Sequence, residues 1–201
     1  MTDRSIVDLY ERHARSFDRD RTRALQEKTW LDRFLRHVPP SGHLLDIGCG
    51  MGEPIAGYCL KAGFRVVGVD SSPSLIAMCR ARFPEAEWVM GDMRDLALGR
   101  RFDGLLAWDS LFHLSASDQR GMFPRFASHA QAGAPLVFTS GSSEGEATGE
   151  YHGDPLYHAS LDPSEYERLL ASNGFAVEHY VRDDHACGDR TVWLALSKRP
   201  D

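Results

Sequence analysis

The spacing of apolar and polar residues predicts strands that alternate with helices through most of the chain. Apolar runs typical of buried strands occur at residues 44–47, 64–70, 88–93, 102–108 and 134–140. A helical spacing follows the first run, with inward side chains expected at Ile55, Tyr58, Cys59 and Ala62. Because strands that alternate with helices pair in parallel and carry helices on both faces, the pattern predicts an α/β fold with a doubly wound sheet.

Capping residues mark where the later helices begin and end. Ser72 followed by proline starts one helix, and residues 117–118 start another. The second of these is expected to turn inward Met122, Phe123, Phe126, Ala127 and Ala130. Asp162 and Glu165 have the offsets of a capping box, and the glycine stop at residues 172–174 ends the helix that they begin.

The two ends of the chain depart from this alternation. Residues 175–181 and 191–197 read as strands with no helix between them, so we expect an antiparallel hairpin at the sheet edge. Residues 5–22 are polar with sparse aromatics and predict one or two short helices on the surface, outside the core. Residues 24–38 predict a helix with one apolar face.

Composition places the chain among ordinary globular domains. Its 201 residues are 42% hydrophobic and 26% charged, and a domain of this size buries about 70% of its unfolded surface. No apolar run approaches the roughly 18 residues of a membrane helix, and the start has no apolar core of a secretory signal. The four cysteines and nine histidines lack metal-binding or C-x-x-C spacing. A cytoplasmic protein with reduced cysteines and without a metal is therefore expected.

Charge is distributed unevenly along the chain, whose formal net charge is −6. Residues 1–40 hold nine basic and seven acidic side chains, whereas residues 141–190 hold three basic and eleven acidic ones. Binding of nucleic acid needs a basic track for the phosphates, and the sequence has none. A small ligand, cationic or neutral, is favoured over a nucleic acid or a membrane.

The most informative segment is residues 44–52, Leu-Leu-Asp-Ile-Gly-Cys-Gly-Met-Gly. An apolar strand carries Asp46 near its end, glycine then stands at every second position, and a helix begins at once. A glycine turn between a buried strand and a helix is where doubly wound folds hold a nucleotide-like cofactor. The dinucleotide fingerprint G-x-G-x-x-G would place its third glycine at position 53, which is Glu53. Acids beside the turn disfavour a pyrophosphate.

This segment resembles the first motif of the class I S-adenosylmethionine-dependent methyltransferases, an acid followed by G-x-G-x-G. Their cofactor has no phosphate and carries an ammonium and a sulfonium, which an acid-flanked turn suits. Later segments follow in the order of the family, so the resemblance covers roughly residues 41–198. It implies a Rossmann-like sheet of seven strands, mostly parallel with an antiparallel last strand. The whole chain would form one methyltransferase domain, with a helical cap (1–40), a cofactor-binding half (41–140) and an acceptor half (141–201).

The resemblance also implies roles for single residues. Asp70 ends a strand 22 residues after Gly48, where a carboxylate accepts hydrogen bonds from both ribose hydroxyls. Asp92 is expected at the adenine amino group, with Met93 over the ring. The complete set implied for the cofactor is Asp46, Gly48, Cys49, Gly50, Asp70, Ser71, Asp92, Met93 and Trp108.

Three residues are candidates for the acceptor side. His113 follows the fourth strand, and we expect it to act as a base that Asp109 orients, with a half-buried structural histidine as the alternative. Tyr157 and His158 offer a hydroxyl and an imidazole, or else they pack the preceding segment down. The aromatic residues Tyr10, Phe17 and Trp30 either shield the sulfonium or pack in the core.

Residues 140–163 are the least regular segment, with glycines at intervals of four among polar residues. Long loops are uncommon in small domains unless they serve a site. We therefore predict a lid or an acceptor-binding loop, with an idle insertion as the alternative.

Methyl transfer from a sulfonium is an in-line displacement in which alignment can supply about 7–11 kcal/mol. A base is needed only if the acceptor is protonated, so an oxygen, nitrogen or sulfur acceptor in a small metabolite stays open. Two other functions stay open as well. These are a non-catalytic S-adenosylmethionine-binding or scaffold protein and an NAD(P)-dependent oxidoreductase. Either a monomer or a homodimer is compatible with the sequence.

Overall fold

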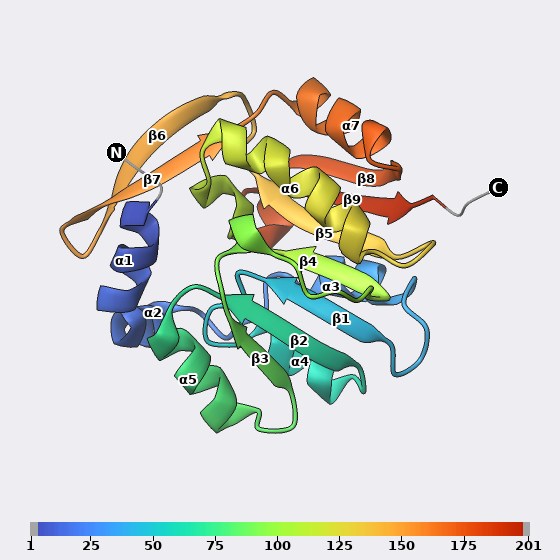
Figure 1. Ribbon diagram of the computed structural model, residues 1–201. Helices are drawn as coiled ribbons and strands as arrows, with labels where there is room; N and C mark the ends of the chain where they lie inside the picture. Colours follow the sequence, from blue (N-terminus) through green and yellow to red (C-terminus); the bar gives the residue numbers. More distant parts are fainter. Residues whose placement is uncertain (1–3, 199–201) are drawn as a thin grey trace.

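The computed structural model describes residues 4–198, in which seven strands form one sheet (Figure 1). The strands are β1 (His43–Ile47), β2 (Arg65–Asp70), β3 (Glu87–Met90), β4 (Gly104–Ala107), β5 (Pro135–Ser140), β8 (Phe175–Asp184) and β9 (Arg190–Ser197). Their order across the sheet is β3-β2-β1-β4-β5-β9-β8. The first five are parallel, whereas β9 pairs antiparallel with both β5 and β8. The predicted doubly wound sheet with a reversed last strand and an edge hairpin is confirmed.

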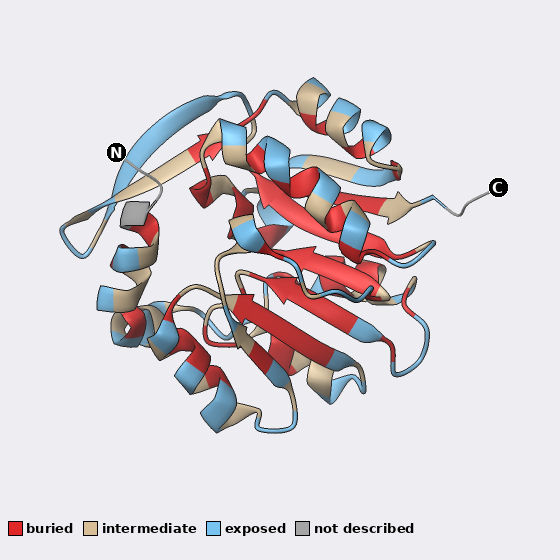
Figure 2. Cartoon of the chain, in the orientation of Figure 1, coloured by how far each residue is buried: buried red, intermediate tan, exposed pale blue. Residues whose placement is uncertain are grey.

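Helices cover both faces of this sheet, and the sheet separates two hydrophobic cores. The helices are α1 (Arg4–Arg12), α2 (Ala14–Asp20), α3 (Lys28–Leu35), α4 (Ile55–Lys61), α5 (Pro73–Arg82), α6 (Ala116–His129) and α7 (Pro163–Ser172). Apolar side chains of α6 and α7 pack on one face, and those of α3, α4 and α5 pack on the other. Figure 2 shows the central strands buried along their length, while the helices keep an exposed outer side. The layers are therefore helix, sheet and helix.

The first two helices lie deeper than the sequence suggests. Ile6, Leu9 and Ala14 are buried, so the prediction that residues 5–22 lie outside the core is wrong. The carboxylate of Glu11 accepts hydrogen bonds from two hydroxyls at the start of α5, at 2.5 Å from Ser72 and 2.6 Å from Ser74. These partners are more than 60 residues away in the sequence, so local polarity could not reveal the contact.

The segment expected to be an irregular loop is a β-hairpin. Strands β6 (Gly145–Tyr151) and β7 (Asp154–Ser160) pair antiparallel in a two-stranded sheet of their own. Residues His152 and Gly153 make the turn, with φ angles of +51° and +86°. Every residue of β6 except the last is exposed. Strand prediction failed here because it relies on one buried face, and this strand has none.

The turn of the hairpin is joined to the first two helices by ion pairs. Asp154 lies 2.9 Å from the guanidinium of Arg12 and 2.7 Å from Nε2 of His13. Across the turn, Nε2 of His152 lies 2.8 Å from Asp20. The hairpin and the helices α1 and α2 therefore form one continuous layer at one side of the sheet, on the left in Figure 1.

Three predicted boundaries also change. The helix α6 starts two residues early, because the hydroxyl of Ser115 accepts a hydrogen bond from the amide of Asp118 at 3.1 Å. The helix expected over residues 24–38 is limited to α3. Ala62 follows α4 and is exposed, since the helix ends before this residue could face the core.

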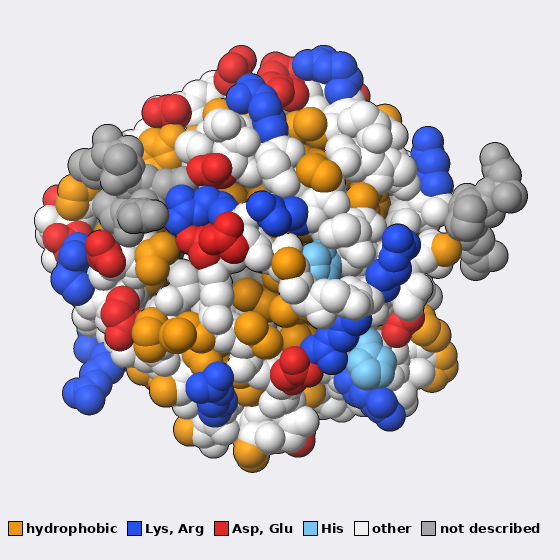
Figure 3. Space-filling model, in the orientation of Figure 1, with side chains coloured by type: hydrophobic (Ala, Val, Ile, Leu, Met, Phe, Trp, Pro, Cys, Tyr) orange, Lys and Arg blue, Asp and Glu red, His pale blue; other side chains and the backbone are white. Residues whose placement is uncertain are grey.

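On the face seen in Figure 3, Lys and Arg side chains are interspersed with Asp and Glu. Within residues 4–198, none of the helices has the length and apolar character needed to cross a membrane.

Candidate functional site

The carboxyl ends of β1, β2 and β4 meet at one edge of the sheet, and a cavity lies there beneath α1 and α2. Its floor is formed by the glycine turn after β1, the end of β2 and the segment after β4. Its roof consists of Ile6, Val7, Tyr10 and Phe17. This is the edge at which doubly wound sheets hold their ligands.

The glycine turn depends on conformations and spaces that only glycine permits. Gly48 and Gly50 have φ angles of +77° and +55°, in the region that disfavours other residues. A Cβ atom at Gly48 would lie 2.4 Å from the Cβ atom of Ser110. The amide of Gly48 donates to the carbonyl of Val69 at 2.8 Å, which fixes the turn against β2. The turn therefore presents bare backbone to the cavity.

Asp70 stands where the sequence places it, at the end of β2 beside the turn. One carboxylate oxygen accepts from the amide of Gly50 at 2.9 Å, and the other accepts from the amide of Ser72 at 2.9 Å. Burial raises the pKa of Asp70 to about 6, although hydrogen bonds from backbone amides act in the opposite direction. A carboxylate has about four acceptor positions, so the side chain can still accept from a hydroxyl of a ligand.

Asp46 lies on the other side of the turn and is 3% exposed. Burial, with a smaller contribution from the charge of Asp70, raises the pKa of Asp46 to about 7. It lines a second, smaller cavity together with Cys49 and Trp108. Cys49 also belongs to the apolar core beneath the turn, where burial raises the pKa of its thiol strongly. These three predicted residues are thus brought together in the smaller cavity, whereas Asp70 lines the main one.

The far end of the main cavity holds Asp92 and Met93. The carboxylate of Asp92 accepts from the amide of Arg94 at 2.9 Å and caps the short helix Met93–Asp95. The same carboxylate also pairs with the guanidinium of Arg94, and Arg94 lines the cavity too. Ser71 lies beside Asp70 in the same wall. The structure therefore brings the predicted adenine and ribose residues into one cavity.

His113 is buried in the short helix Leu111–His113 and reaches the cavity through its ring. Its Nδ1 lies 3.0 Å from the carbonyl of Tyr157, and its Nε2 lies 2.9 Å from the hydroxyl of Tyr10. A carbonyl can only accept, so Nδ1 carries the proton and Nε2 accepts from Tyr10. Burial lowers the pKa of His113 to about 4. The imidazole is therefore neutral near pH 7.

The prediction that Asp109 orients His113 is wrong. Asp109 has a φ angle of +48° and pairs instead with Arg190 of β9, at 2.8 Å. The orienting groups of His113 come from α1 and β7, both far away in the sequence. The contact that the sequence did not predict is the hydrogen bond between the hydroxyl of Tyr10 and the imidazole of His113.

The two candidates on β7 do not line the main cavity. Tyr157 contributes its carbonyl to His113. The ring of His158 lies 4.9 Å from that of His113 and 5.3 Å from that of Phe112, measured between ring centres. Burial lowers the pKa of His158. The hairpin thus supports the imidazole from behind, and its direct contact with a ligand stays a prediction.

The three aromatic candidates lie in two different parts of the structure. Tyr10 and Phe17 line the cavity, and a Cβ atom at Gly50 would lie 3.2 Å from the ring of Phe17. Trp30 instead packs in the core between α3 and the sheet, where its indole donates to Asp184 at 2.8 Å. Packing is therefore the correct alternative for Trp30.

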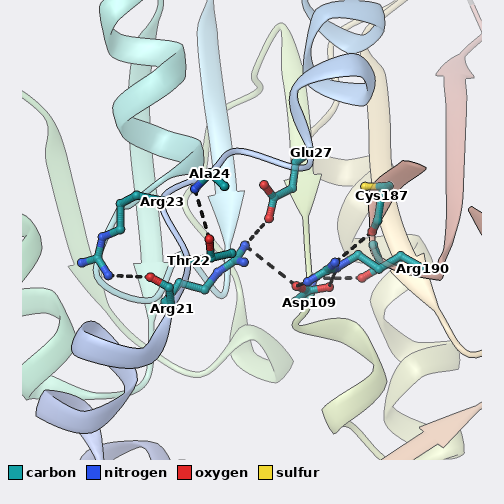
Figure 4. A network of polar contacts seen from close by, with 9 residues as sticks. Arg21, Thr22, Arg23, Ala24, Glu27, Asp109, Cys187 and Arg190 are labelled. Carbon is teal, nitrogen blue, oxygen red and sulfur yellow. Dashed lines mark hydrogen bonds and ion pairs between the residues drawn. The ribbon is translucent and has the colours of Figure 1, made fainter. Parts of the chain in front are cut away.

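A chain of alternating charges borders the smaller cavity (Figure 4). Glu27 is fully buried and pairs with Arg21, and Arg21 lies 3.9 Å from the carboxylate of Asp109. Asp109 in turn pairs with Arg190, which also donates to the carbonyl of Cys187 at 2.9 Å. This network connects the segment after α2 to β9 and holds Arg21 and Asp109 at the cavity wall.

Comparison with known proteins identifies a shared domain. Residues 44–133 match the family described as a methyltransferase domain. The dTDP-3-amino-3,6-dideoxy-alpha-D-glucopyranose N,N-dimethyltransferase of Streptomyces fradiae is 33% identical over 126 residues, which are 62% of this chain and 48% of that protein. The corresponding 3,4,6-trideoxy enzyme of Streptomyces venezuelae is 30% identical over 108 residues, 53% of this chain and 45% of its own. The chain thus spans about half the length of these curated relatives.

A solved structure agrees over nearly the whole chain. The SAM-bound amino pentose methyltransferase CalS10 from Micromonospora echinaspora superposes with a TM-score of 0.71 at 20% identity. The match covers 94% of this chain and 97% of that one. At this level of identity the likeness shows the fold.

Proposed function

Because this chain belongs to the class I S-adenosylmethionine-dependent methyltransferases, we propose that it transfers a methyl group from S-adenosylmethionine to a small metabolite. The observation that carries the proposal is the carboxylate of Asp70, held by the amide of Gly50 at the edge of a shared cavity. In this arrangement a glycine turn and a hydroxyl-binding acid face the same ligand, as nucleotide-like cofactors require.

The residues present fit this cofactor. Asp70 and Ser71 would hold the ribose, with Asp92 and Met93 at the adenine. Gly48, Cys49 and Gly50 would leave room along the turn, and Asp46 and Trp108 would lie toward the amino-acid end. A buried indole nitrogen of Trp108 without a hydrogen-bond partner among the described residues supports a polar ligand there.

When bound, the cofactor supplies an electrophilic methyl group. The protein would contribute position and a water-poor cavity, which are the main requirements of an in-line displacement. The low pKa of His113 makes its imidazole a weak base. We therefore assign His113 and Tyr10 the task of orienting the acceptor, with Tyr157 and His158 holding the imidazole in place.

An amine of a small metabolite is the favoured acceptor. Two relatives are named for N,N-dimethylation of amino sugars, and the hairpin beside His113 is acidic. The exposed strand β6 carries Glu146 and Glu150, which attract a cation more than an anion.

We further propose a single domain with its helical cap at residues 1–40, in a cytoplasmic monomer or homodimer.

The pair of Tyr10 and His113 gives a first prediction. Tyr10→Phe keeps the ring and removes the hydroxyl that donates to the imidazole, so kcat/KM is expected to fall about 10-fold to 100-fold through misplacement of the acceptor. Because His113 titrates near pH 4, the parent enzyme should show no loss from its protonation between pH 8 and about pH 5.5. Methylation rates at saturating S-adenosylmethionine over this pH range measure both effects, because saturation removes the change in cofactor affinity that Asp70 causes. Tyr58→Phe, at a partly buried tyrosine whose hydroxyl donates to Asp32, is the matched control.

The cofactor assignment itself is tested by calorimetry of the purified protein with S-adenosylhomocysteine and, in parallel, with NAD. Micromolar binding of S-adenosylhomocysteine, with no binding of NAD, is the expected result. Binding of NAD alone would exclude the methyltransferase proposal and restore the oxidoreductase alternative. Binding of the thioether without methylation of any amine, alcohol or thiol in a metabolite pool would favour the scaffold alternative.

A further inference from the structure

We propose that Asp20 and Asp154 are positioning residues that join the tip of the hairpin to the helical cap, so that a ligand in the main cavity also fixes the hairpin against His113. The contact is named the tip latch, and it consists of Arg12, His13, Asp20, His152 and Asp154. The inference rests on the proposed function, because the ligand expected in the main cavity is the methyl-donating cofactor or its product.

The main cavity touches the cap and not the hairpin. Tyr10 and Phe17 cover the cavity from α1 and α2, and their rings meet edge to face with centres 5.2 Å apart. None of the described residues that line this cavity comes from β6 or β7. A ligand bound there can therefore stabilise the closed position of the cap directly. It can act on the hairpin only through another part of the protein.

The tip latch supplies that connection through two crossed pairs. Asp154, at the start of β7, accepts from the guanidinium of Arg12 at 2.9 Å and lies 2.7 Å from Nε2 of His13. In the second pair, Nε2 of His152 lies 2.8 Å from Asp20 of α2. The imidazoles of His13 and His152 stack with ring centres 5.5 Å apart and an angle of 19° between them. The cap and the hairpin thus each offer one imidazole and one carboxylate to the other.

The exposure of these pairs suits a contact that opens and closes. The side chain of Asp154 is 33% exposed and that of Asp20 is 38% exposed, so water screens both pairs and each one alone contributes little stability. The pairs form together only when the cap lies against the hairpin. Because a ligand in the main cavity favours that position of the cap, it raises the fraction of molecules in which the tip latch is closed.

Strand β7 connects the tip latch to the imidazole of His113. The carbonyl of Tyr157 accepts from Nδ1 of His113 at 3.0 Å, and it lies three residues after Asp154, a span of about 10 Å along an extended strand. At its other end β7 is fixed to α6, because the buried Gln119 donates to the carbonyl of Ala159 at 2.9 Å. Pairing with β6 along its whole length stiffens β7. The position of the tip therefore determines how well the carbonyl meets the imidazole.

Both hydrogen bonds of His113 depend on the closed arrangement. Its Nε2 accepts from Tyr10 of the cap, and its Nδ1 donates to the carbonyl of Tyr157 in the hairpin. The imidazole assigned to orient the acceptor is thus fixed on both sides only when the cap and the hairpin are joined. Binding in the cofactor cavity in this way completes the acceptor side of the site.

Hydrogen exchange of the whole protein with and without S-adenosylhomocysteine tests the inference. In the parent, the ligand is expected to slow exchange about 3-fold or more in both α1 and β7, although β7 does not line the cavity. The variant with Asp20→Ala and Asp154→Ala lacks both carboxylates of the tip latch. Slowing should remain in α1 and fall below about 1.5-fold in β7. Glu150→Ala, at an exposed acid of the same hairpin, is the matched control and should behave as the parent.

A second measurement follows the imidazole itself. The Nδ1 proton of His113 should give a slowly exchanging NMR signal in the parent with S-adenosylhomocysteine, and it should lose this protection in the variant without the two carboxylates. A general loss of stability would also speed exchange in β1 and β4, which should instead match the parent. His152→Ala removes one of the two pairs and should give an intermediate slowing in β7.

Two results would overturn the inference. One is protection of α1 without protection of β7 in the parent, and the other is protection of β7 that survives the loss of both carboxylates. Calorimetry of each variant with S-adenosylhomocysteine accompanies these measurements. If the parent does not bind this ligand, the proposed function fails and the inference fails with it. That result differs from binding that protects the cap alone.

Discussion

Asp70→Asn is expected to weaken S-adenosylhomocysteine about 100-fold, because two hydrogen bonds to a charged acceptor are lost. The carboxylate accepts from the amides of Gly50 and Ser72 and can still accept from a ligand hydroxyl. An asparagine has one acceptor atom, and its amide nitrogen would face a backbone amide that also donates. The variant therefore loses both the ribose contact and part of the support for the turn.

The same side chain predicts a pH dependence. With a pKa of about 6, Asp70 is ionised and fully competent above that value, and it gains a proton as the pH falls through it. Affinity for S-adenosylhomocysteine should therefore decline between pH 7 and pH 5 in the parent protein, and the decline should be smaller in Asp70→Asn, where only the protonation of Asp46 still contributes. Calorimetry at several pH values measures both quantities. Asp8→Asn, at an exposed residue of α1, is the control, and an unchanged dissociation constant in a folded Asp70→Asn would refute the ribose assignment.

Asp46→Asn is expected to stabilise the protein without ligand by about 2–4 kcal/mol at pH 8. The folded state raises the pKa of Asp46 from 3.8 to about 7, chiefly by burial, so the folded protein binds this proton more tightly than the unfolded chain does. Above pH 7 the ionised carboxylate therefore destabilises the fold. That destabilisation decreases as the pH falls through about 7 and is gone near the unfolded pKa of about 4.

Denaturant unfolding at pH 8 and at pH 5 measures this prediction. The free energy of unfolding of Asp46→Asn should exceed that of the parent at pH 8, and most of the difference should disappear at pH 5. A difference that is the same at both pH values would show that packing, and not ionisation, is the cause. We also expect the variant to bind S-adenosylhomocysteine more weakly, since a destabilising buried acid is retained where function uses it.

The sheet and its glycine turn could be predicted because their signals are local. A buried parallel strand is a continuous apolar run, and the turn that follows β1 needs positive φ angles, which glycine marks directly. Asp70 could be found for the same reason, because its distance from Gly48 along the chain reflects one helix and one strand. Strand order at the edge followed from the missing helix between β8 and β9.

The remainder of the site depends on contacts that no local pattern encodes. The hydroxyl of Tyr10 contacts His113, which lies 103 residues later in the sequence. Asp109 pairs with the guanidinium of Arg190, 81 residues later, and therefore does not orient His113. Arg21 appears in the sequence as one of several arginines in a polar stretch. Its ion pair with the buried Glu27 and its place in the cavity wall distinguish it from the others, and both depend on the fold.

The roof over the cavity also has a consequence for how the protein forms during synthesis. The helices α1 and α2 are synthesised before the sheet, yet Glu11 must wait for Ser72, Tyr10 for His113 and His13 for Asp154, which follow after 61, 103 and 141 residues. The strands of the sheet find neighbours much sooner, because β1 and β2 pair across one short helix. A nascent chain therefore builds the floor of its cavity while the roof is still unattached, and the cavity closes only when β7 has emerged.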